Sequence, residues 1–195
     1  MDRLKKQFDF LLEIDKEKDI GRQTYLSHGL RKENDAEHSW HMAVMAIVMA
    51  EHSNKDIDLL RTVSMILVHD LVEIYAGDTY AYDAKGNADK KEREIAAADK
   101  LFSLLPDDQR DKFRGFWEEF EKGETAESKF AASMDRIQPL MLNNASGGRS
   151  WEEHGVRASQ VYGRNAKTAE GSESLWQYAD ENFIKPNVGK KLKDE

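Results

Sequence analysis

The sequence contains no cysteine, so disulfide bonds, thiolate zinc sites and cysteine nucleophiles are excluded. It also lacks long apolar runs: the longest, AVMAIVMA at residues 43–50, is far too short to cross a bilayer. Proline occurs three times in 195 residues, and glycine falls mostly between segments with helical periodicity. Because apolar and polar residues show no clear alternation, the chain is predicted to be all-α.

The chain has fewer basic than acidic side chains, 29 Lys and Arg against 37 Asp and Glu, and its formal net charge is −8. This balance argues against nonspecific binding to nucleic acid or to an anionic membrane, but is compatible with a small anionic substrate. The first nine residues carry charges throughout, unlike a signal peptide, so we expect a cytoplasmic protein. The length fits one domain over residues 1–195, with a core at about 4–184 and a frayed tail at about 185–195.

Helical periodicity predicts several amphipathic helices. The first would carry four apolar side chains on one face: Leu4, Phe8, Leu11 and Leu12. Residues 15–34 are polar and broken by glycine, so we expect an irregular connection there. Asn34, with Glu37 three residues on, has the pattern of a helix start that leads to about residue 53. The next helix is expected to continue from about residue 57 to near Gly77.

The feature that points to chemistry is the adjacent pair His69-Asp70, which follows an apolar run at residues 65–68. A histidine and a carboxylate in a core-forming segment are destabilising unless something pairs with them, and a divalent metal satisfies both. His38 opens the preceding helix. Since consecutive helices of a bundle are commonly antiparallel neighbours, His38 can meet the pair, with His41, one turn on, as an alternative.

A fourth ligand is expected from Asp135, whose neighbours Met134 and Ile137 are core-like. Two imidazoles and two carboxylates suit one divalent ion of Zn, Mn, Fe, Co or Ni. Such an ion can polarise a phosphoryl oxygen and lower the pKa of a bound water. Glu73, one helical turn beyond the His-Asp pair, would face the same pocket and could act as a general acid or base.

Each of these residues has an ordinary explanation when it is taken alone. A buried histidine is more often a satisfied core residue than a metal ligand, and adjacent His-Asp pairs occur by chance. Asp135 could form an ion pair with Arg136 or with a neighbouring helix. Only the ordered set, together with its surroundings, favours a metal site over these readings.

Three extended strings in order carry a resemblance to a known family: RKENDAEHSWHMA from residue 31, ILVHDLVEIYAGDTYAYD from residue 66 and TAESKFAASMDRIQPL from residue 125. The chain resembles the HD-domain metal-dependent phosphohydrolases, and within them the subgroup related to the 5'-deoxynucleotidases, over roughly residues 4–183. The resemblance implies an all-α, single-domain HD-type helical bundle. It also implies one divalent metal, with ligands His38, His69, Asp70 and Asp135.

The resemblance implies further roles around the metal. The catalytic acidic residue of the family falls on Glu73, and a second one, placed near the sugar and phosphate of the nucleotide, falls on Asp78. The arginine that binds the substrate phosphate falls on Arg22. Gln23 stands where these nucleotidases carry an aromatic residue that helps to exclude the ribose 2'-hydroxyl, so the sugar preference stays open. Relatives of this kind tend to be homodimers.

These observations predict a phosphomonoesterase that acts on (deoxy)nucleoside 5'-monophosphates. One alternative is an HD enzyme that releases triphosphate from dNTPs, against which the net charge argues mildly. Another is a regulatory module that binds a metal or nucleotide without turnover; a purely structural helical scaffold would leave the His69-Asp70 pair without a partner. No histidine occurs between residues 71 and 134, which favours one metal over the two-metal HD phosphodiesterases.

Overall fold

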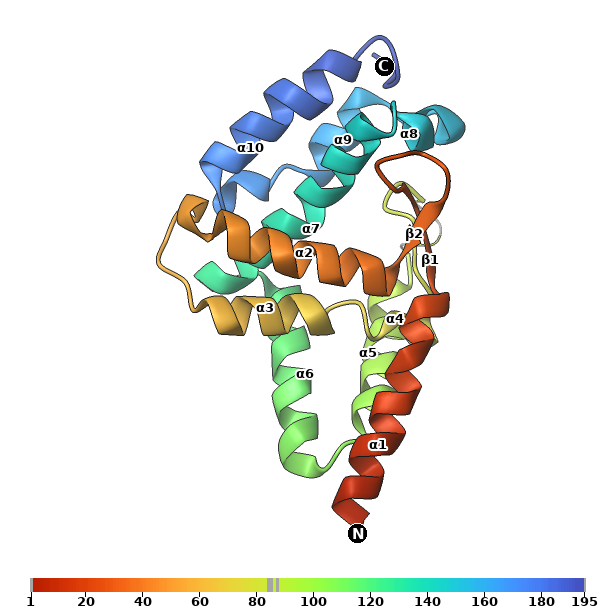
Figure 1. The fold of residues 1–195 in the computed structure, drawn as a ribbon, viewed down its shortest axis with the longest axis vertical. Coiled ribbons are helices and arrows are strands. Elements are labelled where there is room, and N and C mark those ends of the chain that lie inside the picture. The colour runs from red at the N-terminus through yellow and green to blue at the C-terminus, as the bar shows by residue number, and fades with distance from the viewer. Residues whose placement is uncertain (1, 84–85, 87, 195) are drawn as a thin grey trace.

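Residues 2–83, 86 and 88–194, as described by a computed structural model, form ten α-helices and one two-stranded hairpin (Figure 1). The helices are α1 (Asp2–Ile14), α2 (Asp35–Met49), α3 (Leu59–Val68), α4 (Glu73–Ala76), α5 (Lys90–Phe102), α6 (Asp107–Lys122), α7 (Ala126–Ala145), α8 (Arg149–His154), α9 (Ala158–Arg164) and α10 (Glu173–Ala179). The strands β1 (Gly21–Tyr25) and β2 (Lys32–Asn34) pair antiparallel. The all-α prediction is therefore confirmed, with the hairpin as an addition. Within the described residues, no helix is both long and apolar enough to cross a membrane.

The centre of the fold consists of α2, α3 and α7, which pack on one another. Each of these helices supplies buried apolar side chains, such as Met42, Ile66 and Met134. At one end α8, α9 and α10 surround α7, and at the other end α1, α5 and α6 extend away from the centre (Figure 1). The central helices therefore lie between the two ends of the molecule (Figure 1).

The buried apolar residues form two clusters, one at each end of the molecule. The first joins α2, α3 and α7 to the C-terminal helices and includes Ile66 and Trp151. The second joins α1, the end of α3, α5 and α6, and includes Val68 and Phe102. Because α3 contributes Ile66 to one cluster and Val68 to the other, the next residue, His69, emerges where the two clusters meet.

The connection at residues 15–34 is more ordered than expected. A 3-10 helix at Asp15–Asp19 leads into the β1–β2 hairpin, whose register pairs Gly21 with Asn34 and Tyr25 with Lys32. Gly29 takes a left-handed backbone, with φ of +71°, which closes the turn between the strands. The prediction of a partly irregular connection missed this hairpin because strands this short carry too little alternation to be recognised.

The helix expected to continue to Gly77 is in fact interrupted. α3 ends at Val68, His69 follows as its C-terminal cap, and a tight turn leads into the short α4. Gly77 then ends α4 with φ of +77°, a conformation that other residues rarely adopt. The His-Asp pair therefore sits in a break between helices, where its side chains are not confined to one helical face.

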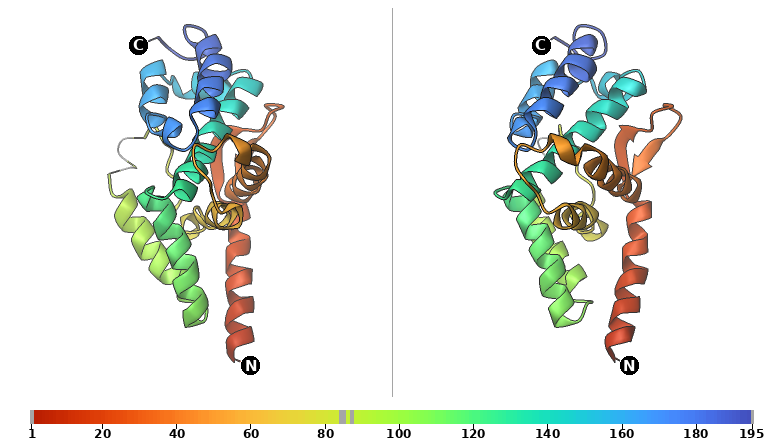
Figure 2. Two further views of the ribbon diagram at one scale, coloured as in Figure 1. Left: turned by 90° about the vertical axis from the view of Figure 1, so that its left-hand side faces the viewer. Right: turned by 60° about the vertical axis from the view of Figure 1, so that its left-hand side comes forward.

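Two segments differ from expectation in their burial. The tail is not frayed: Leu192 is 1% exposed within the first cluster, and hydrogen bonds from Lys193 N to Val156 O and from Ala158 N to Lys193 O fasten it. Conversely, the apolar face expected on the first helix points into solvent, while Phe10 supplies the buried contact of α1. Figure 2 shows that α1 projects beyond the central helices, which leaves much of its surface uncovered.

Candidate metal centre and active site

His38 is positioned by the start of α2. Asn34 Oδ1 accepts a hydrogen bond from Glu37 N (2.9 Å), and Glu37 Oε2 accepts one from Asn34 N (3.1 Å), which forms the expected capping box. The first turn of α2 then places His38 fully inside the protein, with Nε2 3.2 Å from Asp135 Oδ1 on α7. Burial, and then the positive charge of Arg22, lower the pKa of His38 to about 4, so its ring is neutral.

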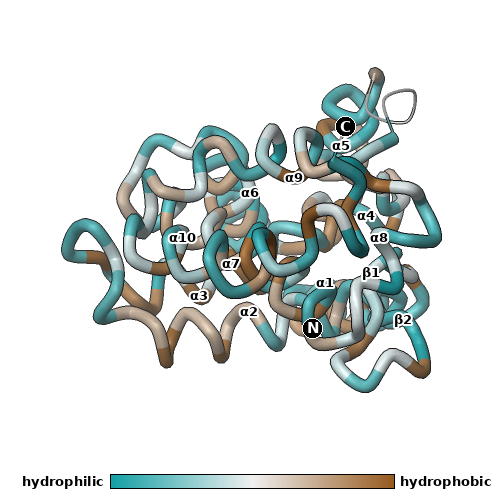
Figure 3. The backbone as a smooth tube through the Cα atoms, turned by 90° about the horizontal axis from the view of Figure 1, so that it is seen from above, coloured by the Kyte–Doolittle hydropathy of each residue, from teal (hydrophilic) through white to brown (hydrophobic). Residues whose placement is uncertain are grey.

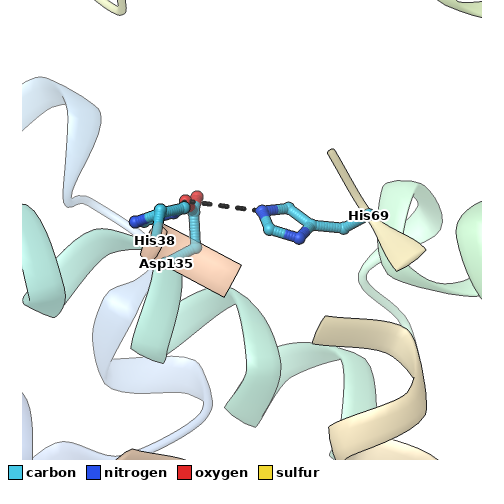
Figure 4. A group of neighbouring side chains, drawn as sticks. All are labelled: His38, His69 and Asp135. Atoms are coloured by element: carbon cyan, nitrogen blue, oxygen red, sulfur yellow. Dashed lines mark hydrogen bonds and ion pairs between the residues drawn. The ribbon is translucent and has the colours of Figure 1, made fainter. Parts of the chain in front are cut away.

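His69 approaches the same carboxylate from the break after α3. Its Nδ1 lies 2.7 Å from Ile66 O, and its Nε2 lies 4.0 Å from Asp135 Oδ1 and 3.0 Å from Asp70 Oδ2. Figure 4 shows the His69 ring directed at Asp135, beside His38. Burial alone would lower the pKa of His69, but the Asp70 carboxylate raises it to about 9. A position where carboxylates stabilise a charged imidazole is one where they would also stabilise a metal cation.

The donor atoms here fit a divalent metal. One atom each from His38, His69 and Asp135 lies within 4.8 Å of the others. Both Nδ1 atoms already contact a protein oxygen, and His69 Nε2 is buried with no well-directed hydrogen bond among the described residues. Asp70, next to His69 Nε2, also lies within 4.8 Å of Asp35 and Glu73 in a second acidic group. The residues predicted as ligands are therefore brought together.

Arg22 lies at the centre of the acidic group. From β1 it places Nη1 3.0 Å from Asp35 Oδ1 and 2.9 Å from Asp70 Oδ2, with 15% of its side chain exposed. Although burial would raise the pKa of Asp70, His69 and then Arg22 hold it well below its usual range. Arg31, by contrast, pairs with Glu37 at the exposed surface.

Glu73 is 3% exposed at the start of α4. Burial, followed by the negative charges of Asp70, Asp35 and Asp78, raises the pKa of Glu73 to about 11. Its carboxyl group therefore holds a proton at neutral pH, which is the form a general acid needs. Lys90 of α5 places Nζ 3.6 Å from Glu73 Oε1, a contact that sequence reasoning missed because it crosses from one helix to the next.

Asp78 follows Gly77 and is partly buried near the rim of the acidic group. Burial raises the pKa of Asp78; Arg22 opposes this shift and Asp70 adds to it. The predicted substrate residues Arg22 and Asp78 are thus close enough to influence each other electrostatically.

Three buried residues near the site were not identified from the sequence. His41, considered above as an alternative metal ligand, makes a different contact. His41 does not join the donor group; its Nδ1 lies 3.3 Å from Gln138 Nε2. Gln138 and Glu33 are both buried beside His38, and Glu17 lies close enough for its charge to interact with Asp70. No local pattern marks Glu17 or Glu33, since each is a single charged residue in a polar stretch.

Comparisons with known proteins agree with this geometry. The family model described as HD domain matches residues 14–176. The 5'-deoxynucleotidase HDDC2 of Bos taurus is 34% identical over 134 residues, which cover 68% of this chain and 63% of that protein. The protein of the same name from Homo sapiens is 36% identical over 112 residues, which cover 57% of this chain and 53% of that protein. The chain therefore spans between about half and two thirds of the length of these curated relatives.

Solved structures extend the similarity to nearly the whole fold. A protein from Magnetospirillum magnetotacticum MS-1, described as a predicted metal-dependent phosphohydrolase, has a TM-score of 0.92 and 44% identity. The match covers 97% of this chain and 95% of that one. A conserved hypothetical protein from Pyrococcus furiosus has a TM-score of 0.65 at 22% identity and covers 89% of this chain and 97% of its own, which shows a common fold.

Proposed function

Because this chain belongs to the HD domain family, we propose that it is a metal-dependent phosphohydrolase acting on (deoxy)nucleoside 5'-monophosphates. The observation that supports this most directly is the convergence of His38 Nε2, His69 Nε2 and the Asp135 carboxylate near a buried Glu73. The substrate class is supported by the curated relatives, which are named 5'-deoxynucleotidase.

The proposed cofactor is one divalent ion of Mn, Co, Zn, Fe or Ni, held by His38, His69, Asp70 and Asp135. This mixed set of nitrogen and oxygen donors is of the kind that such ions bind. When bound, the ion supplies a Lewis acid that polarises a phosphoryl oxygen and lowers the pKa of water.

Glu73 is proposed to move the proton that the reaction requires. As the bond from the water oxygen to phosphorus forms, the bond from phosphorus to the 5' oxygen of the nucleoside breaks. The leaving oxygen takes the proton of Glu73, and the proton lost by the attacking water restores the Glu73 carboxyl. The raised pKa of Glu73, which follows from its burial and from neighbouring carboxylates, keeps it protonated at the start of the reaction.

Arg22 and Asp78 are proposed to place the substrate. The Arg22 guanidinium, which lies beside Asp70, would attract the phosphate dianion to the metal centre and offer it planar N–H donors. Asp78 would accept a hydrogen bond from a sugar hydroxyl at the rim. Phosphate and sugar would then be held on opposite sides of the bond that breaks.

A homodimer is proposed from the surface of α1 and α2. Both helices expose apolar side chains at the same spacing, namely Leu4, Phe8, Leu11 and Leu12 on α1 and Trp40, Val44, Ile47 and Val48 on α2, together called the apolar face. Both helices lie on the same side of the molecule in Figure 2, and apolar positions follow the outer side of α2 in Figure 3. Many large apolar side chains exposed on one side are unusual for a monomer, and an identical second copy offers a matching surface.

Residues 1–195 are also proposed to form a single HD domain, because α3 contributes buried side chains to both apolar clusters and so joins them. We also propose that the protein is cytoplasmic, because nucleoside monophosphates are produced and consumed there.

The experiment that tests the function uses metal-stripped protein with Mn, Co, Ni, Zn, Fe(II) or Mg added back singly. Release of phosphate is measured from ribo- and deoxyribonucleoside 5'-monophosphates, and release of triphosphate from dNTPs. Metal-dependent phosphate release that Asp70→Ala abolishes supports the proposal and gives the sugar preference. Triphosphate as the product would replace it with the triphosphohydrolase, and nucleotide binding without any release would replace it with a regulatory module.

A further inference from the structure

The two histidines of the proposed metal centre are oriented by different kinds of partner. A neutral histidine binds a metal through the ring nitrogen that carries no proton, so the proton must be on the other nitrogen. For His69 this is settled by Ile66 O, 2.7 Å from Nδ1, because a backbone carbonyl can only accept a hydrogen bond. For His38 the partner is the side-chain amide of Gln138, which can either accept or donate.

Glu33 removes this ambiguity. Gln138 Nε2 donates a hydrogen bond to Glu33 Oε2 (2.8 Å), and its second N–H faces His41 Nδ1 at 3.3 Å. With the amide in this orientation, Gln138 Oε1 lies 3.1 Å from His38 Nδ1 and can only accept a hydrogen bond there, in competition with Asp135 Oδ1, which lies 3.2 Å from His38 Nε2. The reverse orientation would bring the amide oxygen against the Glu33 carboxylate, where two acceptors repel each other.

Burial and charge reinforce this arrangement. Gln138 is fully buried and Glu33 is nearly so, which keeps bulk water away from both side chains. Glu33 Oε1 lies 3.6 Å from His38 Nδ1, so its negative charge also favours a proton on that nitrogen. Arg22 places Nε 3.5 Å from the same oxygen, which stabilises the ionised carboxylate.

We propose that Glu33 and Gln138 are positioning residues that hold His38 with its proton on Nδ1 and so leave Nε2 free for the metal. Neither residue touches the ion or the substrate. The inference rests on the metal centre proposed above, and extends it to the residues that determine whether His38 can act as a ligand. Mutating a residue that hydrogen-bonds to a metal ligand in this way typically lowers metal affinity by about 10–100-fold.

The test combines two measurements on the full chain. Nitrogen-15 NMR of the histidine rings reports the tautomer of His38 in metal-stripped protein, and calorimetric titration with Mn²⁺ reports affinity. Both measurements are made at pH 8. Burial raises the pKa of Glu33 to about 7, although Arg22 and Gln138 act to lower it, so the Glu33 carboxylate is ionised at this pH. In wild-type protein we expect the proton of His38 on Nδ1.

Gln138→Met keeps the volume but removes the acceptor. We expect a mixture of His38 tautomers and a loss of Mn²⁺ affinity of about tenfold or more. The matched control is Asn143→Leu, which removes another buried amide from α7 whose Nδ2 bonds to Pro139 O, away from the site. This control should leave both the tautomer and the affinity unchanged.

The decisive variant is the double exchange Glu33→Gln with Gln138→Glu, which swaps the acid and the amide. It keeps an acceptor next to His38 Nδ1 and a donor next to that acceptor, so it should restore the tautomer and an affinity within about threefold of wild type. Glu33→Gln alone, which preserves shape, should leave the Gln138 amide free to turn and give mixed tautomers even if Gln138→Met does not fold.

An unchanged tautomer in both single variants would overturn the inference, whatever happens to affinity. So would an exchanged pair that binds Mn²⁺ as weakly as Gln138→Met does. Failure of the proposed function is distinguishable, because it would show as a lack of nucleotide hydrolysis in wild-type protein whose His38 tautomer and Mn²⁺ binding are as expected.

Discussion

The interior around Arg22 and the outer surface of α1 and α2 reverse the usual distribution of residues. Inside, Glu33, Asp35 and Glu73 are at most 3% exposed although each carries a carboxyl group. Outside, Leu12 is 75% exposed and Trp40 is 65% exposed although both are apolar. Acidic residues are almost never fully buried unless they are paired, and large apolar patches are seldom left in water.

The comparison teaches that the two regions would be stabilised by different additions, a cation in the interior and an apolar surface outside. The buried carboxylates repel one another, and among the described residues Arg22 and Lys90 pair directly with carboxylates of this interior. A divalent cation would neutralise part of the remaining charge. The apolar face has no such conflict of charge, and a second apolar surface would remove it from water. Changes in one region should therefore leave the other unaffected.

The largest effect is expected from Glu73→Gln. Removing the proton donor should lower phosphate release by about 10²- to 10⁴-fold, while Mn²⁺ binding and the dimer stay close to wild type. Steady-state assays and Mn²⁺ titration check this. Glu92→Gln on the exposed side of α5 is the control and should keep full activity. If Glu73→Gln turned over like wild type, Glu73 would have no part in the mechanism.

Arg22→Gln should strongly destabilise the metal-stripped protein. The change leaves the Asp35 carboxylate buried without its charged partner and leaves Asp70 with His69 alone, a defect that costs about 3–5 kcal/mol. Urea unfolding measures the loss. Arg3→Gln breaks the exposed pair with Asp108 and should leave the unfolding midpoint unchanged. Equal effects of the two changes would contradict the view that the interior depends on Arg22.

Ile47→Glu should separate the proposed dimer. A charge placed within the apolar face would be buried without a partner on association, so the dimer Kd should rise by about 100-fold. Light scattering after size exclusion measures the mass. Ile95→Glu, an exposed apolar position on α5, serves as the control and should stay dimeric. A dimer that survives Ile47→Glu would place the interface elsewhere.

The smallest effect is a pH dependence that comes from Glu17. Burial, and then Asp70 and Asp35, raise the pKa of Glu17 to about 7 from an ordinary 4.5, so the folded protein holds this proton more tightly than the unfolded chain. Its stabilising contribution is complete below about pH 4.5 and is lost as the pH rises through about 7. Glu17→Gln should therefore match wild type at pH 4 and exceed it at pH 8 by on the order of 1–3 kcal/mol. Urea unfolding of metal-stripped protein at both values tests this, and equal stability at pH 8 would contradict it.

The sequence predicted which of these side chains converge better than it predicted what surrounds them. His38, His69, Asp70 and Asp135 could be identified because they lie in strings with strong local patterns: a capping box, an apolar run and a core-like helix. Glu33 and Gln138 could not, since their contact joins residues that are distant in the chain and depends on how β2 lies against α7.

Burial was the least predictable property. The apolar spacing of α1 is the same in a helix that packs inward and in one that faces a partner, so Leu4 and Phe8 carried no sign of their exposure. The charged tail suggested fraying, yet Leu192 packs in the first cluster and backbone hydrogen bonds of Lys193 fasten the chain beside it. Periodicity identifies which residues share a face, but not what covers that face.

The division of α3 between two clusters has a mechanical consequence. Ile66 and Val68 belong to opposite ends of the molecule, and His69 is the next residue along the chain. Local unfolding at either end would therefore shift the His69 imidazole relative to Asp135 and weaken the binding of a metal ion. Conversely, an ion that binds His69 and Asp135 together would stabilise both ends of the molecule against local unfolding. Metal binding should therefore raise the melting temperature of the entire fold in one cooperative transition.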